Sequence, residues 1–435
     1  MDAEKNLIFS EVQIGDCFGE DDIIRIEDEY GGRAERGDEK LNVAFIPVRG
    51  GSKSIPLKNI KLINGKPLVF WTIRAACHCR YIEKVYVSTD NDLIRKTVKE
   101  LSECGDKDFL KIVIINRSME SASDTATTES AMLEFALKYD FENIILIQAT
   151  SPLLTEDDLN RGFEIYAHDD TDSVLSAVKQ KRFIWHEDDF GRAIPNNYDF
   201  MKRPRRQDIE GYYVENGAFY ITSRDRLLKS QNRISGNIKI CEMNESSYYE
   251  IDEIEEWIIV EKLLNEQEGK RKREKKPSAK PKIVLMDCDG VLTDGGMYYS
   301  EKGDEIKRFN TLDGMGIKLL RESGIKVGII TGENRELNIK RAEKLHLDYI
   351  EQGVSDKLAI IKRICMESNV DLSEVLYIGD DVNDLEAIKS VGIGCSVANG
   401  IDEVKLAATY VTAATGGNGA VREVADWILG GSIDV

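Results

Sequence analysis

Two aspartates, Asp287 and Asp289, follow an apolar run in the second half of the chain. The segment KIVLMDCDGVLT at 282–293 is typical of a buried strand that ends in the pattern Asp-x-Asp-Gly-x-x-Thr. This spacing places both carboxylates at the carboxyl end of the strand. One carboxylate of such a pair can attack phosphorus while the other donates and then accepts a proton. The residue types therefore favour covalent phosphoryl transfer.

A basic loop with two glycines follows a strand-like run near the start of the ordered sequence. The run NVAFIPV leads into RGGSKSIPLKN at 49–59, where Gly50 and Gly51 allow a tight turn. Three cations lie on this loop: Arg49, Lys53 and Lys58. Three positive charges around a glycine turn suit a triphosphate. The loop lacks GxxxxGK[ST] and GxGxxG, so it is neither a Walker P-loop nor a dinucleotide fingerprint.

The elements that must position these residues form two series of strands alternating with helices. A length of 435 residues predicts two or three domains. Alternating strands and helices predict an α/β fold with largely parallel sheets in each series. The predicted boundaries are an acidic, mobile leader at 1–40, a first domain at 41–264, a basic linker at 265–281 and a second domain at 282–435.

Composition limits the classes of partner. The chain is 42% hydrophobic and 31% charged, which is typical of a soluble globular protein. A net charge of −19 argues against nucleic acid as a partner and leaves small-molecule substrates. The sequence predicts neither a signal peptide nor a membrane span, and its eight cysteines lack metal-binding spacing. A cytoplasmic location is expected, and the basic run would suit a nuclear location in a eukaryotic cell.

Six motifs in the first domain occur in a recognisable order: RGGSKSIPLKN, STD at 88–90, RSMESASDTA, LIQATSPL, KRPRRQD and ENGAFYI. Together they resemble the cytidylyltransferases that activate sialic-type sugars, and the last two resemble the animal CMP-sialic acid synthetases. The resemblance implies a three-layer nucleotidyltransferase fold of the GT-A, Rossmann-like kind. It also implies that the anomeric hydroxyl of a nine-carbon 2-keto acid attacks the α-phosphorus of CTP and releases pyrophosphate.

The same resemblance assigns site residues. Nucleotide binding falls to Arg49, Lys53, Lys58, Asn59, Ser88 and Arg117, of which Arg49 and Lys53 also serve catalysis. Sugar binding falls to Gln148, Thr150, Ser151, Arg206, Asn216 and Tyr220, with Arg206 facing the sugar carboxylate. Helix capping by Thr150 and Ser151, and a core position for Tyr220, are the alternatives.

A triphosphate needs a hard cation, so Mg²⁺ is expected in the first domain. The matching acidic pair is Glu250 and Asp252. The family more often has Asp at both positions, which makes Asp252 the better ligand. Leu154 is a second departure, because many relatives carry Arg there.

Four elements of the second domain resemble the haloacid dehalogenase phosphatases. They are the Asp287–Thr293 motif, Thr331 after the strand VGII, Lys357 in SDK, and GDDVND at 379–384. About 20 residues separate the first motif from the next predicted helix, too few for a large cap, so the resemblance implies a capless haloacid dehalogenase-like Rossmannoid fold.

The roles that follow from this resemblance are a nucleophile, Asp287, and an acid–base, Asp289. Thr331 and Lys357 would bind the transferred phosphoryl group. The expected Mg²⁺ ligands are Asp287, the main-chain carbonyl of Asp289 and Asp380. Asp384 would ligate through water or orient Lys357, and Asp381 is a weaker candidate.

The second domain is similar to capless phosphatases that act on 3-deoxy-2-keto acid phosphates and assemble as tetramers. Glu333, Arg341 and Lys344 resemble the nine-carbon branch of that group. Arg422, in the tail motif GGNGAVREV, is a further substrate contact, with a surface salt bridge as the alternative.

The combined prediction is a bifunctional enzyme, a homotetramer with Mg²⁺ in both domains, that dephosphorylates a nonulosonate 9-phosphate and couples the free acid to CTP. Two alternatives stay open: a second domain that serves only assembly, and a CMP-KDO synthetase joined to a KDO 8-phosphate phosphatase. KDN, N-acetylneuraminate and di-amino relatives are not distinguished.

Overall fold

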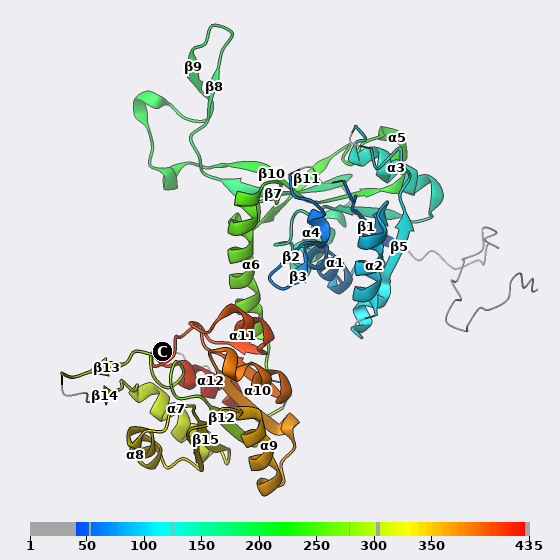
Figure 1. The fold of residues 1–435 in the computed structure, drawn as a ribbon. Coiled ribbons are helices and arrows are strands. Elements are labelled where there is room, and N and C mark those ends of the chain that lie inside the picture. Colours follow the sequence, from blue (N-terminus) through cyan, green and yellow to red (C-terminus); the bar gives the residue numbers. More distant parts are fainter. Residues whose placement is uncertain are drawn as a thin grey trace, which may run out of the picture. The chain divides into compact units, whose positions relative to one another are not determined.

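The computed structural model describes residues 41–51, 54–103, 105–123, 125–277, 279–301 and 305–430. The predicted acidic leader and Lys53 therefore lie outside the described residues. Within them the chain forms two α/β domains, each built on its own sheet (Figure 1). No helix in the described part of the chain is both long enough and apolar enough to cross a membrane.

The amino-terminal domain is built on a seven-stranded sheet with the order β11-β7-β10-β6-β1-β4-β5. Its strands are β1 (Asn42–Pro47), β4 (Lys84–Thr89), β5 (Ile112–Asn116), β6 (Asn143–Ile147), β7 (Ser173–Gln180), β10 (Tyr212–Ser223) and β11 (Ile238–Met243). All pairs are parallel except those of β10 with β6 and β7. Strands β1, β4 and β6 are short, mostly buried apolar runs, as expected for the centre of a sheet between two helical layers, whereas the edge strand β11 is partly exposed.

Helices cover both faces of this sheet. The helices are α1 (Leu68–His78), α2 (Asp92–Ser102), α3 (Thr128–Lys138), α4 (Glu156–Tyr166), α5 (Arg224–Ser230) and α6 (Ile254–Glu274). Buried residues of α1, α2 and α4 pack in one core cluster, and those of α3 and α5 pack in another. Two small antiparallel pairs complete the domain: β2 (Leu62–Ile63) with β3 (Lys66–Pro67), and β8 (Trp185–Glu187) with β9 (Ala193–Pro195).

Helix α6 extends beyond the domain boundary predicted at residue 264. Arg74 forms a bidentate ion pair with Glu268 at 2.6 and 2.8 Å, and Arg271 lies 2.8 Å from Glu156. Glu, Lys and Arg are good helix formers, so the charged run can continue the helix as far as Glu274. The two ion pairs hold this part of the helix to α1 and α4. The charge density of the segment had suggested a linker.

The carboxyl-terminal domain has a fully parallel six-stranded sheet with the order β16-β15-β12-β17-β18-β19. Its strands are β12 (Ile283–Met286), β15 (Lys326–Ile330), β16 (Tyr349–Glu351), β17 (Val375–Gly379), β18 (Ile393–Ser396) and β19 (Tyr410–Val411). The hairpin β13 (Tyr298–Tyr299) and β14 (Glu305–Ile306) follows β12 where a cap domain would otherwise be inserted.

This second sheet also lies between two helical layers. Helices α7 (Thr311–Glu322), α8 (Glu336–Leu345) and α12 (Ala420–Leu429) share one core cluster, and α9 (Lys357–Ser368), α10 (Leu385–Ser390) and α11 (Asp402–Ala407) share the other. Because the central strands β15, β12 and β17 are parallel neighbours, their carboxyl ends meet at one edge of the sheet. The observed layers confirm the predicted two-domain α/β fold.

Candidate active sites

The amino-terminal domain contains a cavity of about 390 Å³ at the carboxyl end of its sheet. Seven of the residues predicted for the nucleotide, sugar and metal line it: Arg49, Lys58, Asn59, Arg117, Gln148, Thr150 and Asp252. They come from the loop after β1, the segments after β5 and β6, and the turn before α6. The fold therefore brings together residues as far apart in the chain as Arg49 and Asp252.

Hydrogen bonds hold the loop after β1 in shape. Asn59 Nδ2 donates to the Arg49 carbonyl at 3.1 Å, which closes the loop on itself. The Gly50 amide donates to Asp90 Oδ1 at 3.0 Å, so the aspartate of the STD motif anchors the glycine turn. The sequence alone indicated no role for Asp90.

Lys58 connects this loop to the acidic turn. Its Nζ donates to the Ile251 carbonyl at 2.7 Å and to Asp252 Oδ1 at 3.0 Å, and its side chain is 12% exposed. The cation is therefore held at the wall of the cavity by fixed partners. Such a pre-oriented charge can stabilise an anion without first losing the rotamer freedom of a surface lysine.

Arg117 is half-buried and lines the same cavity. It donates through Nη2 to the Ser121 carbonyl, while its Nε is buried without a hydrogen-bond partner among the described residues. Burial lowers the pKa of this guanidinium. Ser88, at the end of β4, is buried, and its carbonyl accepts the Val48 amide at 2.9 Å. Ser88 therefore supports the loop from behind and does not line the cavity.

Four predicted sugar residues do not line the cavity. Ser151 is buried behind it, and Asn216 Nδ2 donates to the Ser247 carbonyl at 2.9 Å. Arg206 is exposed, and its Nε donates to the Lys181 carbonyl at 2.9 Å. Tyr220 lies in the core, which is the alternative to a sugar-binding role, and its hydroxyl donates to Glu215. The cap of α4 is Thr155, so the capping alternative for Thr150 and Ser151 is wrong.

The acidic pair separates into one partly buried carboxylate, Glu250, and one exposed carboxylate, Asp252. Asp252 lines the cavity with its side chain 68% exposed. Burial, reinforced by the charge of Asp252, raises the pKa of Glu250 to about 7. Glu250 lies against Gly217, where a Cβ atom would be 2.7 Å from Oε1. The donor chemistry at the cavity wall fits a hard cation, and Asp252 is the carboxylate that reaches it.

The second site lies where three neighbouring strands end in the carboxyl-terminal domain. Asp287 follows β12, Thr331 follows β15 and Asp380 follows β17. Carboxylate oxygens of Asp287, Asp380 and Asp384 all lie within 4.8 Å of one another. Asp380 Oδ1 is buried without a hydrogen-bond partner in the described structure. A cluster of carboxylates with an unpartnered oxygen fits a divalent cation with oxygen ligands.

Lys357 is the buried cation of this cluster. Its Nζ lies 2.8 Å from Asp287 Oδ2 and 2.6 Å from Asp384 Oδ1, and its side chain is 1% exposed. Burial disfavours the charged form of Lys357, but the two carboxylates outweigh this effect and raise its pKa. Burial raises the pKa of Asp287 to about 6, against the opposing effect of Lys357.

The two oxygens of Asp384 are occupied by protein donors. Oδ1 accepts the Tyr377 hydroxyl at 2.6 Å as well as Lys357, and Oδ2 accepts the Asp380 amide at 2.9 Å. Of its two predicted roles, the geometry therefore favours orienting Lys357. Asp381 is exposed, and its Oδ1 accepts a hydrogen bond from the backbone amide of Val382 at 2.7 Å.

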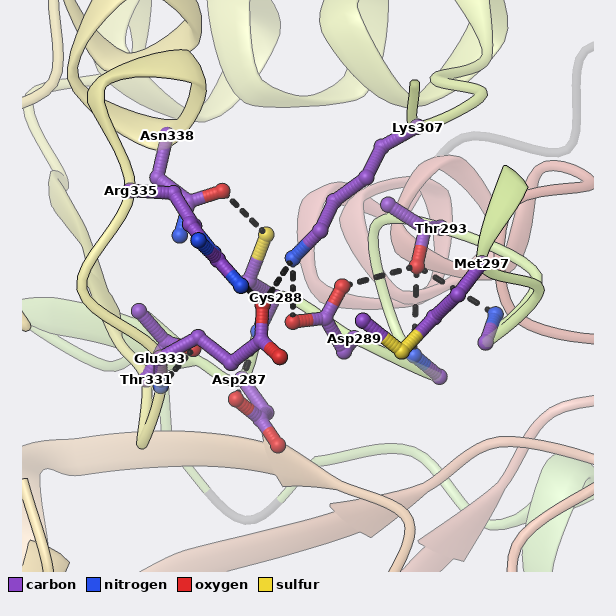
Figure 2. Close-up of polar contacts among 12 residues, drawn as sticks. Asp287, Cys288, Asp289, Thr293, Met297, Lys307, Thr331, Glu333, Arg335 and Asn338 are labelled. Carbon is purple, nitrogen blue, oxygen red and sulfur yellow. Dashed lines mark hydrogen bonds and ion pairs between the residues drawn. The ribbon is translucent and has the colours of Figure 1, made fainter. Parts of the chain in front are cut away.

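Asp289 and Glu333 are joined by a lysine that sequence analysis missed. Lys307 Nζ donates to Asp289 Oδ2 and to Glu333 Oε2, both at 2.7 Å (Figure 2). The Thr293 hydroxyl donates to Asp289 Oδ1 at 3.3 Å. Lys307 stands in EIKRFN just after β14, outside every motif that the sequence offered. Its residue type alone gave no signal, since surface lysines are common.

The other predicted substrate residues have protein partners or lie at the surface. Arg341 Nη2 donates to the Asn310 carbonyl at 3.1 Å, and its guanidinium lies over Phe309 at 5.0 Å. Lys344 is exposed in the last turn of α8. Arg422 Nε donates to both carboxylate oxygens of Asp426 at 2.9 Å, which is the salt bridge held as the alternative for it.

Comparisons with known proteins identify both domains. The cytidylyltransferase family model matches residues 43–270, and the haloacid dehalogenase-like hydrolase model matches 328–424. N-acylneuraminate cytidylyltransferase A of Danio rerio is 33% identical over 396 residues, 89% of this chain and 88% of that protein.

The second domain has its own relatives. The 3-deoxy-D-manno-octulosonate 8-phosphate phosphatase of Yersinia pestis is 40% identical over 152 residues, 35% of this chain and 81% of that protein. A solved phosphatase of the same name from Moraxella catarrhalis, in complex with magnesium, phosphate and KDO, is 40% identical and covers 38% of this chain and 91% of its own, with a TM-score of 0.35. The chain belongs to the N-acylneuraminate cytidylyltransferase family and carries a carboxyl-terminal domain of the haloacid dehalogenase-like phosphatases.

Proposed function

We propose that this chain is a bifunctional enzyme of sialic-type sugar activation. Its carboxyl-terminal domain hydrolyses a nonulosonate 9-phosphate, and its amino-terminal domain couples the free 2-keto acid to CTP. The observation that carries the proposal is the intact cluster around Asp287, in which Lys357 lies 2.8 Å from the nucleophile and the acid–base Asp289 has fixed partners. A domain that served only assembly would have no need to bury these charges.

The phosphatase reaction proceeds in two steps. A carboxylate oxygen of Asp287 attacks phosphorus, the bond from phosphorus to the sugar O9 breaks, and Asp289 gives its proton to that oxygen. Water then attacks the aspartyl-phosphate, Asp289 takes a proton from it, and the bond from phosphorus to Asp287 breaks to release phosphate. Lys357 and Thr331 hold the phosphoryl oxygens.

Asp287, the main-chain carbonyl of Asp289 and Asp380 would hold Mg²⁺ in this domain. The unpartnered, buried Asp380 Oδ1 supports that assignment. When bound, the ion screens the anionic nucleophile from the anionic substrate. The role of Gly290 follows from the same geometry: its φ is 88°, and a Cβ atom there would lie 1.9 Å from Asp380 Oδ2. Glycine leaves Asp380 room to reach the nucleophile.

The cytidylyltransferase reaction transfers a nucleotide from CTP. The anomeric oxygen of the sugar acid attacks the α-phosphorus, and the bond to the pyrophosphate oxygen breaks. Arg49, Lys53 and Lys58 bind the triphosphate and offset the charge that grows on pyrophosphate as it leaves. Asp252 would hold Mg²⁺ against the phosphates, since it is the carboxylate that lines the cavity. Gln148 and Thr150 line the same cavity and are assigned to the sugar.

Glu333 points to a nine-carbon substrate because eight-carbon phosphatases of this type usually carry Arg at that position. We propose that its substrate is KDN 9-phosphate or N-acetylneuraminate 9-phosphate. We also propose that the enzyme forms a homotetramer and acts in the cytoplasm. A KDO 8-phosphate phosphatase is the second candidate, favoured by the 40% identity to the Yersinia pestis enzyme.

A substrate panel tests the proposal. The purified full chain with Mg²⁺ is given KDN 9-phosphate, N-acetylneuraminate 9-phosphate or KDO 8-phosphate, and inorganic phosphate is measured before and after CTP is added. We expect phosphate from a nine-carbon ester, followed by its CMP conjugate. Faster release from KDO 8-phosphate would support the second candidate. CMP-sugar formed from the free acid, with no phosphate from any ester, would make the second domain an assembly module.

A further inference from the structure

A single ammonium group joins the acid–base residue to the residue that selects the sugar. Lys307 Nζ lies 2.7 Å from Asp289 Oδ2 and 2.7 Å from Glu333 Oε2, and Figure 2 shows its side chain reaching down between the two carboxylates. Because both oxygens contact one nitrogen, they lie within two hydrogen-bond lengths of each other. The spacing between the two carboxylates is therefore set by Lys307.

Burial differs sharply within this triad. The Lys307 side chain is 1% exposed, whereas the side chains of Asp289 and Glu333 are 33% and 35% exposed. The lysine is therefore buried, while the two carboxylates that it contacts are partly exposed to solvent. The Arg335 Nε lies 3.9 Å from Glu333 Oε2, so Glu333 has cationic neighbours on more than one side. A buried cation with two charged partners is held far more rigidly than a surface lysine.

The hydrogen bonds also distinguish the two oxygens of Asp289. Lys307 donates to Oδ2 at 2.7 Å, and an ammonium group can donate a hydrogen bond but cannot accept one. Oδ1 accepts a hydrogen bond from the Thr293 hydroxyl at 3.3 Å, and a hydroxyl, unlike an ammonium group, can also turn to accept one. Lys307 and Thr293 thus hold the carboxyl group of Asp289 in one orientation.

We propose that Lys307 is a positioning residue that couples sugar recognition by Glu333 to leaving-group protonation by Asp289. The proposal rests on the proposed phosphatase function. Without the ammonium group, two carboxylates at this spacing repel each other and Asp289 loses its fixed orientation. The loss falls on leaving groups that need a proton, such as a sugar alkoxide. It spares p-nitrophenolate, which leaves without protonation and makes no polyol contact with Glu333.

Lys307→Met removes the charge and keeps the length of the side chain. In the full chain, we expect kcat for the preferred nonulosonate 9-phosphate to fall about 100-fold, the range of a lost general acid, while kcat for p-nitrophenyl phosphate stays within about threefold. Lys307→Gln, which is polar and shorter, is expected to show the same split. Lys318→Met is the matched control, because Lys318 is a surface residue of α7 with its side chain 62% exposed. It is expected to change neither rate.

The two substrates separate a positioning role from a structural one. Equal losses on both substrates in both Lys307 variants would overturn the proposal, because they would show that Lys307 only supports the fold. Unchanged hydrolysis of the sugar phosphate would overturn it as well. A wild-type chain that releases phosphate from p-nitrophenyl phosphate but from no sugar ester would contradict the proposed function itself, and the Lys307 proposal with it.

Discussion

Lys357 Nζ lies 2.6 Å from Asp384 Oδ1, and the two side chains are 1% and 0% exposed. Burying two charges costs desolvation energy that their attraction only partly restores, so such a pair is weak evidence for a stabilising role. The location of the pair beside Asp287 explains better why it is buried. The same ammonium group lies 2.8 Å from Asp287, so Asp384, which accepts the Tyr377 hydroxyl, holds the cation beside the proposed nucleophile.

Asp384→Asn is expected to lower phosphate release about 100-fold and to destabilise the carboxyl-terminal domain by about 3 kcal/mol. The reason is that the buried charge of Lys357 would keep only one of its two carboxylate partners. CMP-sugar formation from the free acid should not change. The measurements are phosphate release, CMP-sugar synthesis and thermal unfolding on one preparation. Glu386→Gln is the control, since its ion pair with Lys389 is exposed and worth less than about 1 kcal/mol. Unaltered phosphate release in Asp384→Asn would contradict the role given to this carboxylate.

Gly290→Ala is expected to abolish phosphate release, because the added Cβ atom would lie 1.9 Å from Asp380 Oδ2 at a φ of 88°. Gly324→Ala separates this clash from backbone strain: its φ is 85° and no heavy atom lies within 4 Å of the added Cβ. Left-handed strain alone costs about 1–2 kcal/mol, so Gly324→Ala should lower the melting temperature and keep its activity. Equal activity in the two variants would show that Asp380 tolerates displacement.

Much of the second site was predictable because its residues stand at strand ends. Asp287, Thr331 and Asp380 each follow an apolar run, and parallel strands bring such positions together without further information. Lys307 was not predictable in this way. It follows a short hairpin, and its burial depends on two carboxylates that are 18 and 26 residues away in the chain. Pairing at that separation leaves no periodic trace in the sequence.

In the first domain Arg49, Lys58 and Asn59 of the loop after β1 line the cavity, whereas Tyr220 and Asn216 do not. Both lie on β10, whose side chains alternate between the faces of the sheet, and the sequence did not show which face meets the cavity. Tyr220 packs in the core with Phe45 and Phe135. Arg206 lies between β9 and β10 in an excursion whose path no local pattern determines.

Lys58→Met is expected to raise KM for CTP about tenfold or more, because the side chain is 12% exposed and held at the cavity wall by Asp252 and the Ile251 carbonyl. Phosphate release by the second domain should not change. The KM for CTP is measured by steady-state kinetics in which CTP is varied at a saturating concentration of sugar acid. Lys99→Met is the control, since Lys99 is a surface residue of α2 with a 70% exposed side chain. A KM for CTP equal to that of the wild type would remove Lys58 from the triphosphate site.

If this chain carries two independent catalytic sites, Asp287→Asn should separate their activities. Both activities are measured on the same preparation: phosphate release from the preferred nonulosonate 9-phosphate, and CMP-sugar formation from the free acid with CTP. We expect phosphate release to be abolished, because the amide of asparagine cannot replace the attacking carboxylate, while CMP-sugar forms at the wild-type rate. Phosphate release that survives this substitution would contradict the assignment of Asp287 as the nucleophile and, with it, the proposed second activity.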